Sequence, residues 1–179
     1  MRSHTCPNSD GGAVKRETHG ACGRGPHTVE ERMADERFLY FAYGSNLNRA
    51  DMRVRCPSAK PLARAVLRDW RLTFRGVADI EPAPGAIVHG ALWLLGNADV
   101  RALDRYEGAP SLYERRPFEV VGPDGPVAAM SYVMTSRDYL GLPSPWYLGR
   151  IADGYRDWGL PLAALRLAVE ATGEGLAGR

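Results

Sequence analysis

The sequence predicts an α+β domain whose mixed or antiparallel sheet curls into a small barrel with a few flanking helices. Strand-like runs outnumber helical ones, and short turn sequences separate most of them. In addition, 45% of the 179 residues are hydrophobic, which is enough for one well-buried core. We therefore expect one domain over residues 36–179, preceded by a tail over residues 1–35.

The tail is rich in Gly, Ser, Thr, His and charged residues and has almost no large apolar residue to anchor it. Such a segment cannot offset the entropy lost on ordering, so we expect it to be disordered and dispensable, or Met33 to be the real start. Its zinc-ligating residue types are His4, Cys6, His19, Cys22 and His27. Their spacing matches no standard zinc motif, and we expect no metal.

An aromatic run at residues 38–43 opens the predicted domain and is typical of a buried strand. A helix should follow it, capped by Ser45 or Asn46 and ending near residue 56. One side of this helix is expected to carry Leu47, Ala50 and Val54.

Three further strands are predicted in the middle of the chain. Residues 64–67 and 70–74 form two short ones, and residues 87–95 form a strongly apolar one. Residues 82–85 contain two prolines and a glycine and therefore predict a loop.

The second half of the domain should hold two helices and a hairpin. Asn97 is expected to cap a helix over residues 98–106 that ends at Gly108, and a final helix covers residues 161–172. The Gly-Pro-Asp-Gly turn at residues 122–125 favours an antiparallel hairpin.

Composition excludes several classes of function. The formal net charge is only +2, and no basic stripe indicates nucleic-acid binding. No stretch approaches the length of a membrane span, and the N-terminus lacks the apolar core of a secretory signal. With three cysteines and no disulfide-type spacing, a cytoplasmic location is expected.

The usual catalytic groups are poorly represented in the domain. Of the four histidines only His89 lies there, within an apolar strand where it is expected to be a core residue. Ser45 lacks the glycine pattern of a nucleophile elbow, and Cys56 has no evident base. No metal-ligand spacing, phosphate loop or dinucleotide fingerprint is present, so an enzyme would have to move protons with carboxylates.

Glu107 is the leading candidate among them. In the predicted helix it falls on the same side as Val100 and Leu103, which should face the core. It also lies in the last turn, where the helix dipole disfavours a negative charge, and partial burial would raise its pKa in the same direction. The alternative is an ordinary helix-end glutamate turned to solvent.

The segment Tyr43-Gly44-Ser45-Asn46-Leu47 is the second candidate. A strand ending in a glycine turn before a helix presents unpaired backbone N–H groups, which can receive a carboxylate or phosphate. The alternative is a simple strand-to-helix turn.

Both candidates lie in segments that resemble the γ-glutamylcyclotransferase (AIG2-like) family. Residues 38–47 resemble the family's opening strand and loop, and residues 103–108 resemble the segment that bears its catalytic glutamate. Residues 131–135, 143–147 and 159–161 resemble its C-terminal part. The likeness spans nearly all of the predicted domain.

This resemblance implies a compact barrel-like α+β fold and no cofactor. It implies that residues 43–47 hold a γ-glutamyl group near Glu107, that the glutamate acts as general base and acid, and that Tyr113 and Tyr147 line or cover the cavity. The products would be 5-oxoproline and a free amine. Core packing is the alternative role for the two tyrosines.

The leaving amine stays open at this stage. The substrate could be a γ-glutamyl amino acid or amine, glutathione, or a γ-glutamyl-protected intermediate of specialised metabolism; a binding module without turnover is a further alternative. Trp146 and Trp158 are expected to be exposed and could serve a homodimer interface.

Overall fold

The computed structural model describes residues 36–178. The predicted tail, Met33 and the tail's histidines and cysteines therefore lie outside the described residues. In chain order the elements are β1 (Arg37–Ala42), η1 (Ser45–Leu47), α2 (Arg49–Arg55), β2 (Lys60–Phe74), β3 (Ala78–Gly96), α3 (Asn97–Glu107), β4 (Tyr113–Gly122), β5 (Gly125–Met134), α4 (Pro145–Asp157) and α5 (Leu162–Ala177).

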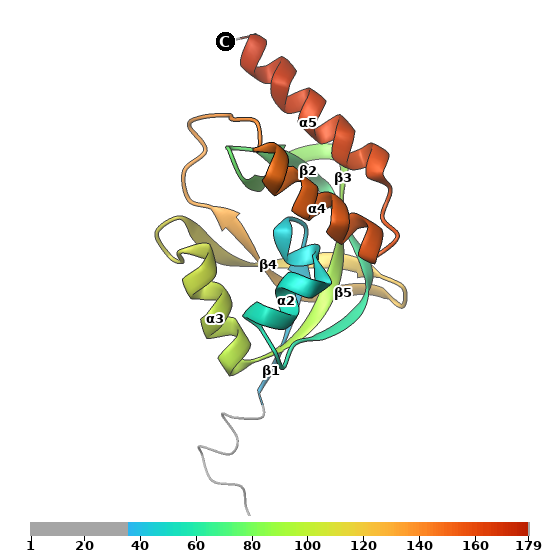
Figure 1. Cartoon of the computed structure of the whole chain (residues 1–179). Helices are drawn as coiled ribbons and strands as arrows, with labels where there is room; N and C mark the ends of the chain where they lie inside the picture. The colour runs from blue at the N-terminus through green and yellow to red at the C-terminus, as the bar shows by residue number, and fades with distance from the viewer. Residues whose placement is uncertain (1–35, 179) are drawn as a thin grey trace, which may run out of the picture.

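The five strands close into a barrel in the order β1-β3-β2-β4-β5, which confirms the predicted α+β barrel. Neighbouring strands are antiparallel except β1 and β5, which run parallel where Tyr40 faces Met130. In Figure 1, α3 and α5 lie towards opposite ends of the molecule, and α2 and α4 lie between them. The sheet is therefore mixed, and this one parallel pair closes the ring.

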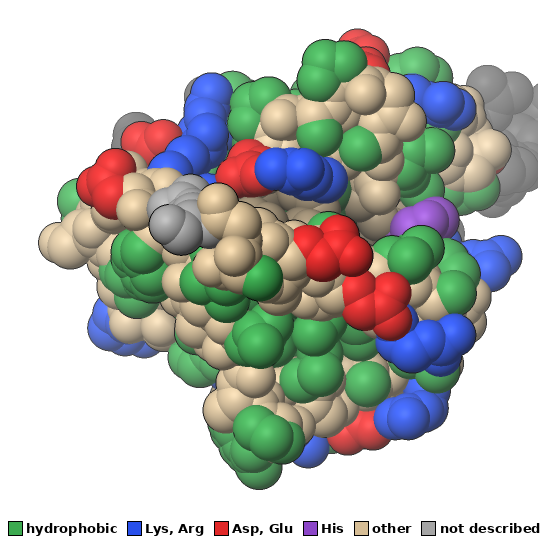
Figure 2. Space-filling view, turned by 90° about the horizontal axis from the view of Figure 1, so that it is seen from above, with side chains coloured by type: hydrophobic (Ala, Val, Ile, Leu, Met, Phe, Trp, Pro, Cys, Tyr) green, Lys and Arg blue, Asp and Glu red, His purple; other side chains and the backbone are tan. Residues whose placement is uncertain are grey.

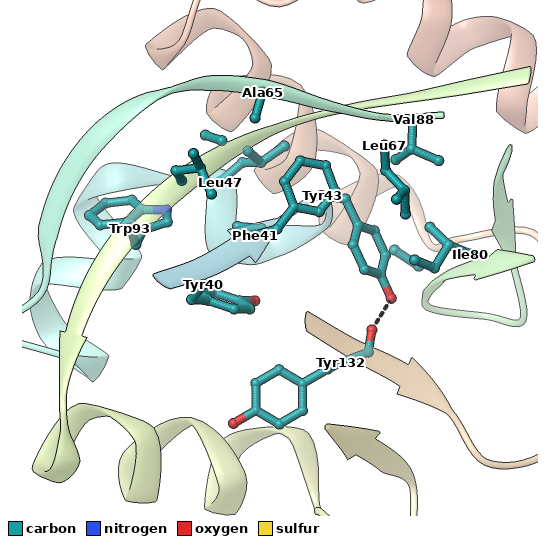
Figure 3. Close-up of a cluster of buried hydrophobic side chains, with 14 of the residues drawn as sticks. Tyr40, Phe41, Tyr43, Leu47, Ala65, Leu67, Ile80, Val88, Trp93 and Tyr132 are labelled. Carbon is teal, nitrogen blue, oxygen red and sulfur yellow. Dashed lines mark hydrogen bonds between the residues drawn. The ribbon is translucent and has the colours of Figure 1, made fainter. Parts of the chain in front are cut away.

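The inward faces of the strands supply the core. Phe41, Leu67, Ile80, Val88 and Trp93 are buried and converge from β1, β2 and β3 (Figure 3). This packing provides the main apolar burial that stabilises the barrel. On the face shown in Figure 2, acidic and basic side chains are interspersed, in keeping with the small net charge.

The middle of the chain is more regular than predicted. The two short strands predicted at residues 64–67 and 70–74 are one strand, β2, and residues 83–86 of the neighbouring β3 form a bulge opposite Asp69. The loop predicted at residues 82–85 is wrong, because these residues belong to β3. Proline is tolerated there because part of the segment lies in the bulge, where Asp69 Oδ1 instead accepts a bond of 2.8 Å from the N–H of Gly85.

The predicted cap of the first helix is also wrong. A 3₁₀ turn, η1, comes first, and Asn48 caps α2 by accepting from the N–H groups of Ala50 and Asp51. The three residues expected on one side of the helix are separated, since Leu47 is buried in η1 whereas Val54 is 82% exposed, and Met52 is the buried residue of α2. The extra turn rotates α2 relative to the predicted register.

The later elements follow the prediction with shifted ends. Gly96 rather than Asn97 is the N-cap of α3, and the carboxylate of Asp99 accepts the N–H of Gly96 at 3.0 Å. The hairpin of β4 and β5 is confirmed, and the final helix runs beyond its predicted end. Helix α4 was missed, although Ser144 as N-cap and Pro145 at the first position are a typical start signal.

Close packing of α4 fixes the turn after β1. A Cβ at Gly154 would lie 2.5 Å from Leu47 Cβ, so only glycine lets α4 approach η1 this closely. Trp158, expected to be exposed, is instead buried and donates from Nε1 to the carbonyl of Leu47 at 2.8 Å; Trp146 is exposed as expected. No helix among the described residues is long and apolar enough to cross a membrane.

Candidate active site

A cavity opens where β1 ends and η1 begins. It is open to solvent and has a volume of about 20 Å³. Half of its ten lining residues are tyrosines, and one is a carboxylate. The lining residues are Tyr40, Tyr43, Gly44, Ser45, Asn46, Ala78, Glu107, Tyr113, Tyr132 and Tyr147.

Glu107 reaches this cavity as the last residue of α3, which ends at Gly108 in the left-handed conformation. Val100 and Leu103 of the same helix are buried, as the sequence predicts. Burial raises the pKa of Glu107 from 4.5 to about 7, against the lowering effect of a hydrogen bond from Asn46 and of the charge of Arg55. A carboxyl group with this pKa can accept and return a proton near neutral pH.

The side chain of Asn46 holds the carboxylate in place. Its Nδ2 donates to Glu107 Oε1 at 2.6 Å and to the hydroxyl of Tyr40 at 2.8 Å. The bond to Oε1 therefore joins Asn46 to the carboxylate of Glu107, which lies 61 positions further along the chain.

Backbone donors lie beside the carboxylate. The first bond of the 3₁₀ turn runs from the N–H of Leu47 to the carbonyl of Gly44, so the N–H groups of Ser45 and Asn46 have no acceptor within the turn. Both residues line the cavity. Gly44 keeps the site open, because a Cβ there would lie 3.1 Å from Ala78 Cβ and 3.6 Å from the hydroxyl of Tyr147.

Ala78 anchors two of the tyrosines through its backbone. Its carbonyl accepts from the hydroxyl of Tyr113 at 2.6 Å, and its N–H donates to the hydroxyl of Tyr147 at 3.2 Å. Tyr43 donates to the carbonyl of Tyr132 at 2.7 Å, the bond drawn in Figure 3. Burial raises the pKa of Tyr147 to about 12, so it is a neutral hydrogen-bonding group at pH 7.

The structure brings together seven of the eight residues expected at the site: Glu107, Tyr43, Gly44, Ser45, Asn46, Tyr113 and Tyr147. It places the eighth, Leu47, in the core outside the lining. Three lining residues were missed, Tyr40, Ala78 and Tyr132. Tyr40 belongs to the aromatic run of the first strand, and its hydroxyl is the only sequence signal that it could face a polar site.

The two weaker nucleophile and base candidates lie elsewhere. Cys56 is buried and its Sγ donates to the carbonyl of Asp99 at 3.6 Å, while burial raises the pKa of the thiol to about 12. Burial lowers the pKa of the half-buried His89, which is absent from the cavity lining. Glu107 is therefore the lining group suited to proton transfer.

Comparison with known proteins identifies relatives of this chain. A family model described as gamma-glutamyl cyclotransferase, AIG2-like, matches residues 40–151. The gamma-glutamylcyclotransferase of Homo sapiens is 35% identical over 142 residues, covering 72% of this chain and 75% of the relative, and that of Bos taurus is 36% identical over 141 residues, covering 71% and 74%. A solved structure named gamma-glutamyl cyclotransferase superposes with a TM-score of 0.68 at 32% identity, covering 74% of this chain and 86% of that one.

Proposed function

The chain belongs to the gamma-glutamyl cyclotransferase, AIG2-like family, and from this premise we propose that it converts a γ-glutamyl amino acid or amine to 5-oxoproline and a free amine. The observation that carries the proposal is Glu107, a carboxyl group with a pKa near 7 inside the cavity. It lies next to Asn46 and the donors at the start of η1.

Glu107 would serve in turn as general base and general acid. It takes a proton from the α-ammonium of the glutamyl group, and the freed amine attacks the γ-carbonyl carbon. A new C–N bond closes the five-membered ring, and the bond from the γ-carbon to the leaving nitrogen breaks. The proton held by Glu107 passes to that nitrogen and regenerates the carboxylate. The ring nitrogen, which still carries two hydrogens and a positive charge after the attack, gives up its second proton to Glu107, which passes it to the released amine. The products are 5-oxoproline with a neutral lactam and a protonated amine, so atoms and charge balance.

The N–H groups of Ser45 and Asn46 would bind the α-carboxylate of the glutamyl group. They lie at the N-terminal end of a helical turn, where the backbone favours an anion. Tyr43, Tyr113 and Tyr147 would enclose the glutamyl methylenes and exclude water. Holding the amine close to the γ-carbonyl supplies rate by orientation, because the attack becomes intramolecular in a fixed geometry.

The relatives are named gamma-glutamylcyclotransferases, and this does not favour the two other candidate functions. These are removal of a γ-glutamyl protecting group and ligand binding without turnover. Removal of a γ-glutamyl protecting group would use the same reaction and the same residues, and differs only in the leaving amine. A binding module without turnover does not need a buried carboxyl group whose ionised form is costly.

The direct test is turnover with purified protein and its Glu107→Gln variant. The panel contains γ-glutamyl amino acids, γ-glutamyl amines and glutathione, and 5-oxoproline is detected by mass spectrometry. Gln keeps an acceptor for Asn46 but cannot carry the proton, so we expect turnover to fall by at least about 1,000-fold while the fold is retained. Near-normal turnover by a folded Gln variant contradicts the mechanism, and absence of product from every substrate contradicts the proposed reaction.

The assembly and location expected from the sequence stay predictions. The exposed Trp146 is consistent with a homodimer, and the low cysteine content is consistent with the cytoplasm. Sedimentation of the wild type and of Trp146→Ala tests whether the protein forms a homodimer through this residue.

A further inference from the structure

We propose that Arg55 is a positioning residue, which orients the amide of Asn46 towards Glu107 and thereby keeps Glu107 able to act as a base. The inference rests on the proposed role of Glu107 and concerns a residue outside the cavity lining. Arg55 is the last residue of α2, and Nη1 of its guanidinium donates to Asn46 Oδ1 at 2.8 Å.

The orientation of the Asn46 amide follows from the chemistry of its neighbours. A guanidinium can only donate, so it must face the amide oxygen, and an ionised carboxylate can only accept, so it must face the amide nitrogen. Arg55 lies on one side of Asn46 and Glu107 on the other. With Arg55 removed, the amide could rotate and present its oxygen to Glu107, which would favour the protonated acid.

Besides the bond to Asn46, two contacts hold the guanidinium of Arg55. Its Cζ lies 3.8 Å from the centroid of the Tyr106 ring, and its Nη2 lies 3.5 Å from a carboxylate oxygen of Asp51. Asp51 is also bound by Arg150 of α4, whose Nε donates to it at 3.1 Å. The side chain of Arg55 is only 17% exposed. These contacts connect α4, α2, the turn after β1 and the end of α3.

The same contacts argue against a direct role of Arg55 in substrate binding. One nitrogen donates to Asn46, another faces Asp51, and the plane of the group is covered by Tyr106. The guanidinium is therefore committed to protein groups rather than offered to a ligand. A substrate-binding arginine would change KM, whereas a positioning arginine should change the pH dependence of kcat.

The other titratable groups that face Glu107 are tyrosines from other elements of the fold. They are Tyr40 of β1, Tyr43 after it, Tyr113 of β4, Tyr132 of β5 and Tyr147 of α4. Burial raises the pKa of each, so all are neutral at pH 7. Among these described neighbours Arg55 supplies the positive charge, and both that charge and the Asn46 bond lower the pKa of Glu107.

The test measures the ionisation of Glu107 without substrate. Protein labelled with ¹³C-glutamate is titrated by NMR, and the Glu107 signal is identified by its loss in Glu107→Gln. In Arg55→Met we expect the pKa of Glu107 to rise by about 0.5–1 pH unit. The matched control is Arg53→Met, because Arg53 is an exposed arginine on the same helix. This substitution should leave the pKa of Glu107 unchanged.

Two further variants test whether the effect of Arg55 on the pKa of Glu107 passes through the amide of Asn46. In an Asn46→Ala background, Arg55→Met should raise the pKa less than in the wild type, because part of the effect runs through the amide. Arg55→Gln, which keeps a polar side chain, replaces the Met variant where that variant does not fold. A smaller rise of the Glu107 pKa is then expected, because Gln removes the charge but keeps an N–H donor for the amide oxygen of Asn46. An unchanged pKa in a folded Arg55 variant overturns the proposal.

Kinetics supply the second readout. In Arg55→Met the acid limb of the kcat–pH profile should shift to higher pH by the same amount as the Glu107 pKa measured by NMR. The KM at pH 8 should change little. A higher KM with an unmoved acid limb overturns the proposal in favour of substrate binding by Arg55. Absence of turnover from every substrate contradicts the proposed reaction alone, since the NMR titration does not depend on it.

Discussion

Two of the arginine–carboxylate clusters among the described residues differ in what lies between the charges. In the first, which we call the ion-pair cluster, Arg75 contacts Asp79 directly at 3.0 Å and Glu81 at 2.7 Å. In the second, the cavity cluster, the amide of Asn46 separates Arg55 from Glu107. The first has its charges paired, and the second leaves its carboxylate with a raised pKa.

The ion-pair cluster is satisfied on every side. The side chains of Arg75 and Asp79 are 2% and 0% exposed, and Asp79 also accepts from the N–H of Met134 at 3.0 Å. Arg75 further donates to the carbonyl of Arg137 at 3.0 Å, which holds the segment between β5 and α4. Direct pairing therefore suits a structural role, whereas pairing through a neutral amide leaves a carboxylate that can exchange protons.

The largest predicted effect comes from breaking the direct pair. Arg75→Met leaves Asp79 buried and uncompensated, so the free energy of unfolding should fall by about 3–5 kcal/mol. Urea denaturation followed by tryptophan fluorescence measures it. Arg75→Met combined with Asp79→Asn should lose less than Arg75→Met alone, because the unpaired charge is gone. A loss below about 1 kcal/mol in the single variant would show that the pair is not structural.

The second prediction is that one type of substitution has opposite effects in the two clusters. Asp79→Asn should destabilise the fold, whereas Glu107→Gln should stabilise it at pH 8. The pKa of Glu107 is about 7 in the folded chain against an ordinary 4.5, so the wild type loses stability as pH rises through that window, by about 3 kcal/mol in total. Gln avoids this loss.

Unfolding free energies at pH 5 and pH 8 check this prediction. The advantage of Glu107→Gln over the wild type should be small at pH 5 and should grow by pH 8. An advantage that is equal at both pH values would mean that the carboxyl group does not titrate between them.

The smallest predicted effect belongs to Glu81, the outer carboxylate of the ion-pair cluster. Its side chain is 19% exposed and is also bound by Nε of Arg71 at 2.8 Å. Glu81→Gln should cost at most about 1 kcal/mol, because Arg75 keeps its buried partner Asp79 and Gln can still accept hydrogen bonds from the arginines. Urea denaturation beside Asp79→Asn measures the contrast, and equal losses would mean that burial does not separate the two carboxylates.

Local patterns predicted most of the site. The position of Glu107 beside Val100 and Leu103 follows from helical spacing, and the donors at Ser45 and Asn46 follow from a strand that ends in a glycine turn. Local patterns failed where an irregular turn intervened. The 3₁₀ turn moved Leu47 into the core and shifted the cap to Asn48.

The amino-acid sequence by itself determined the α+β class, the hairpin, the inward side of α3 and the family. These depend on periodicity and turn chemistry, which act between residues close in the chain. Only the tertiary structure decided that Asn46 meets Glu107, that Arg55 lies behind it and that Ala78 anchors two tyrosines. Those contacts join residues from different elements, and their geometry exists only once the barrel has closed and α4 has packed on the turn after β1.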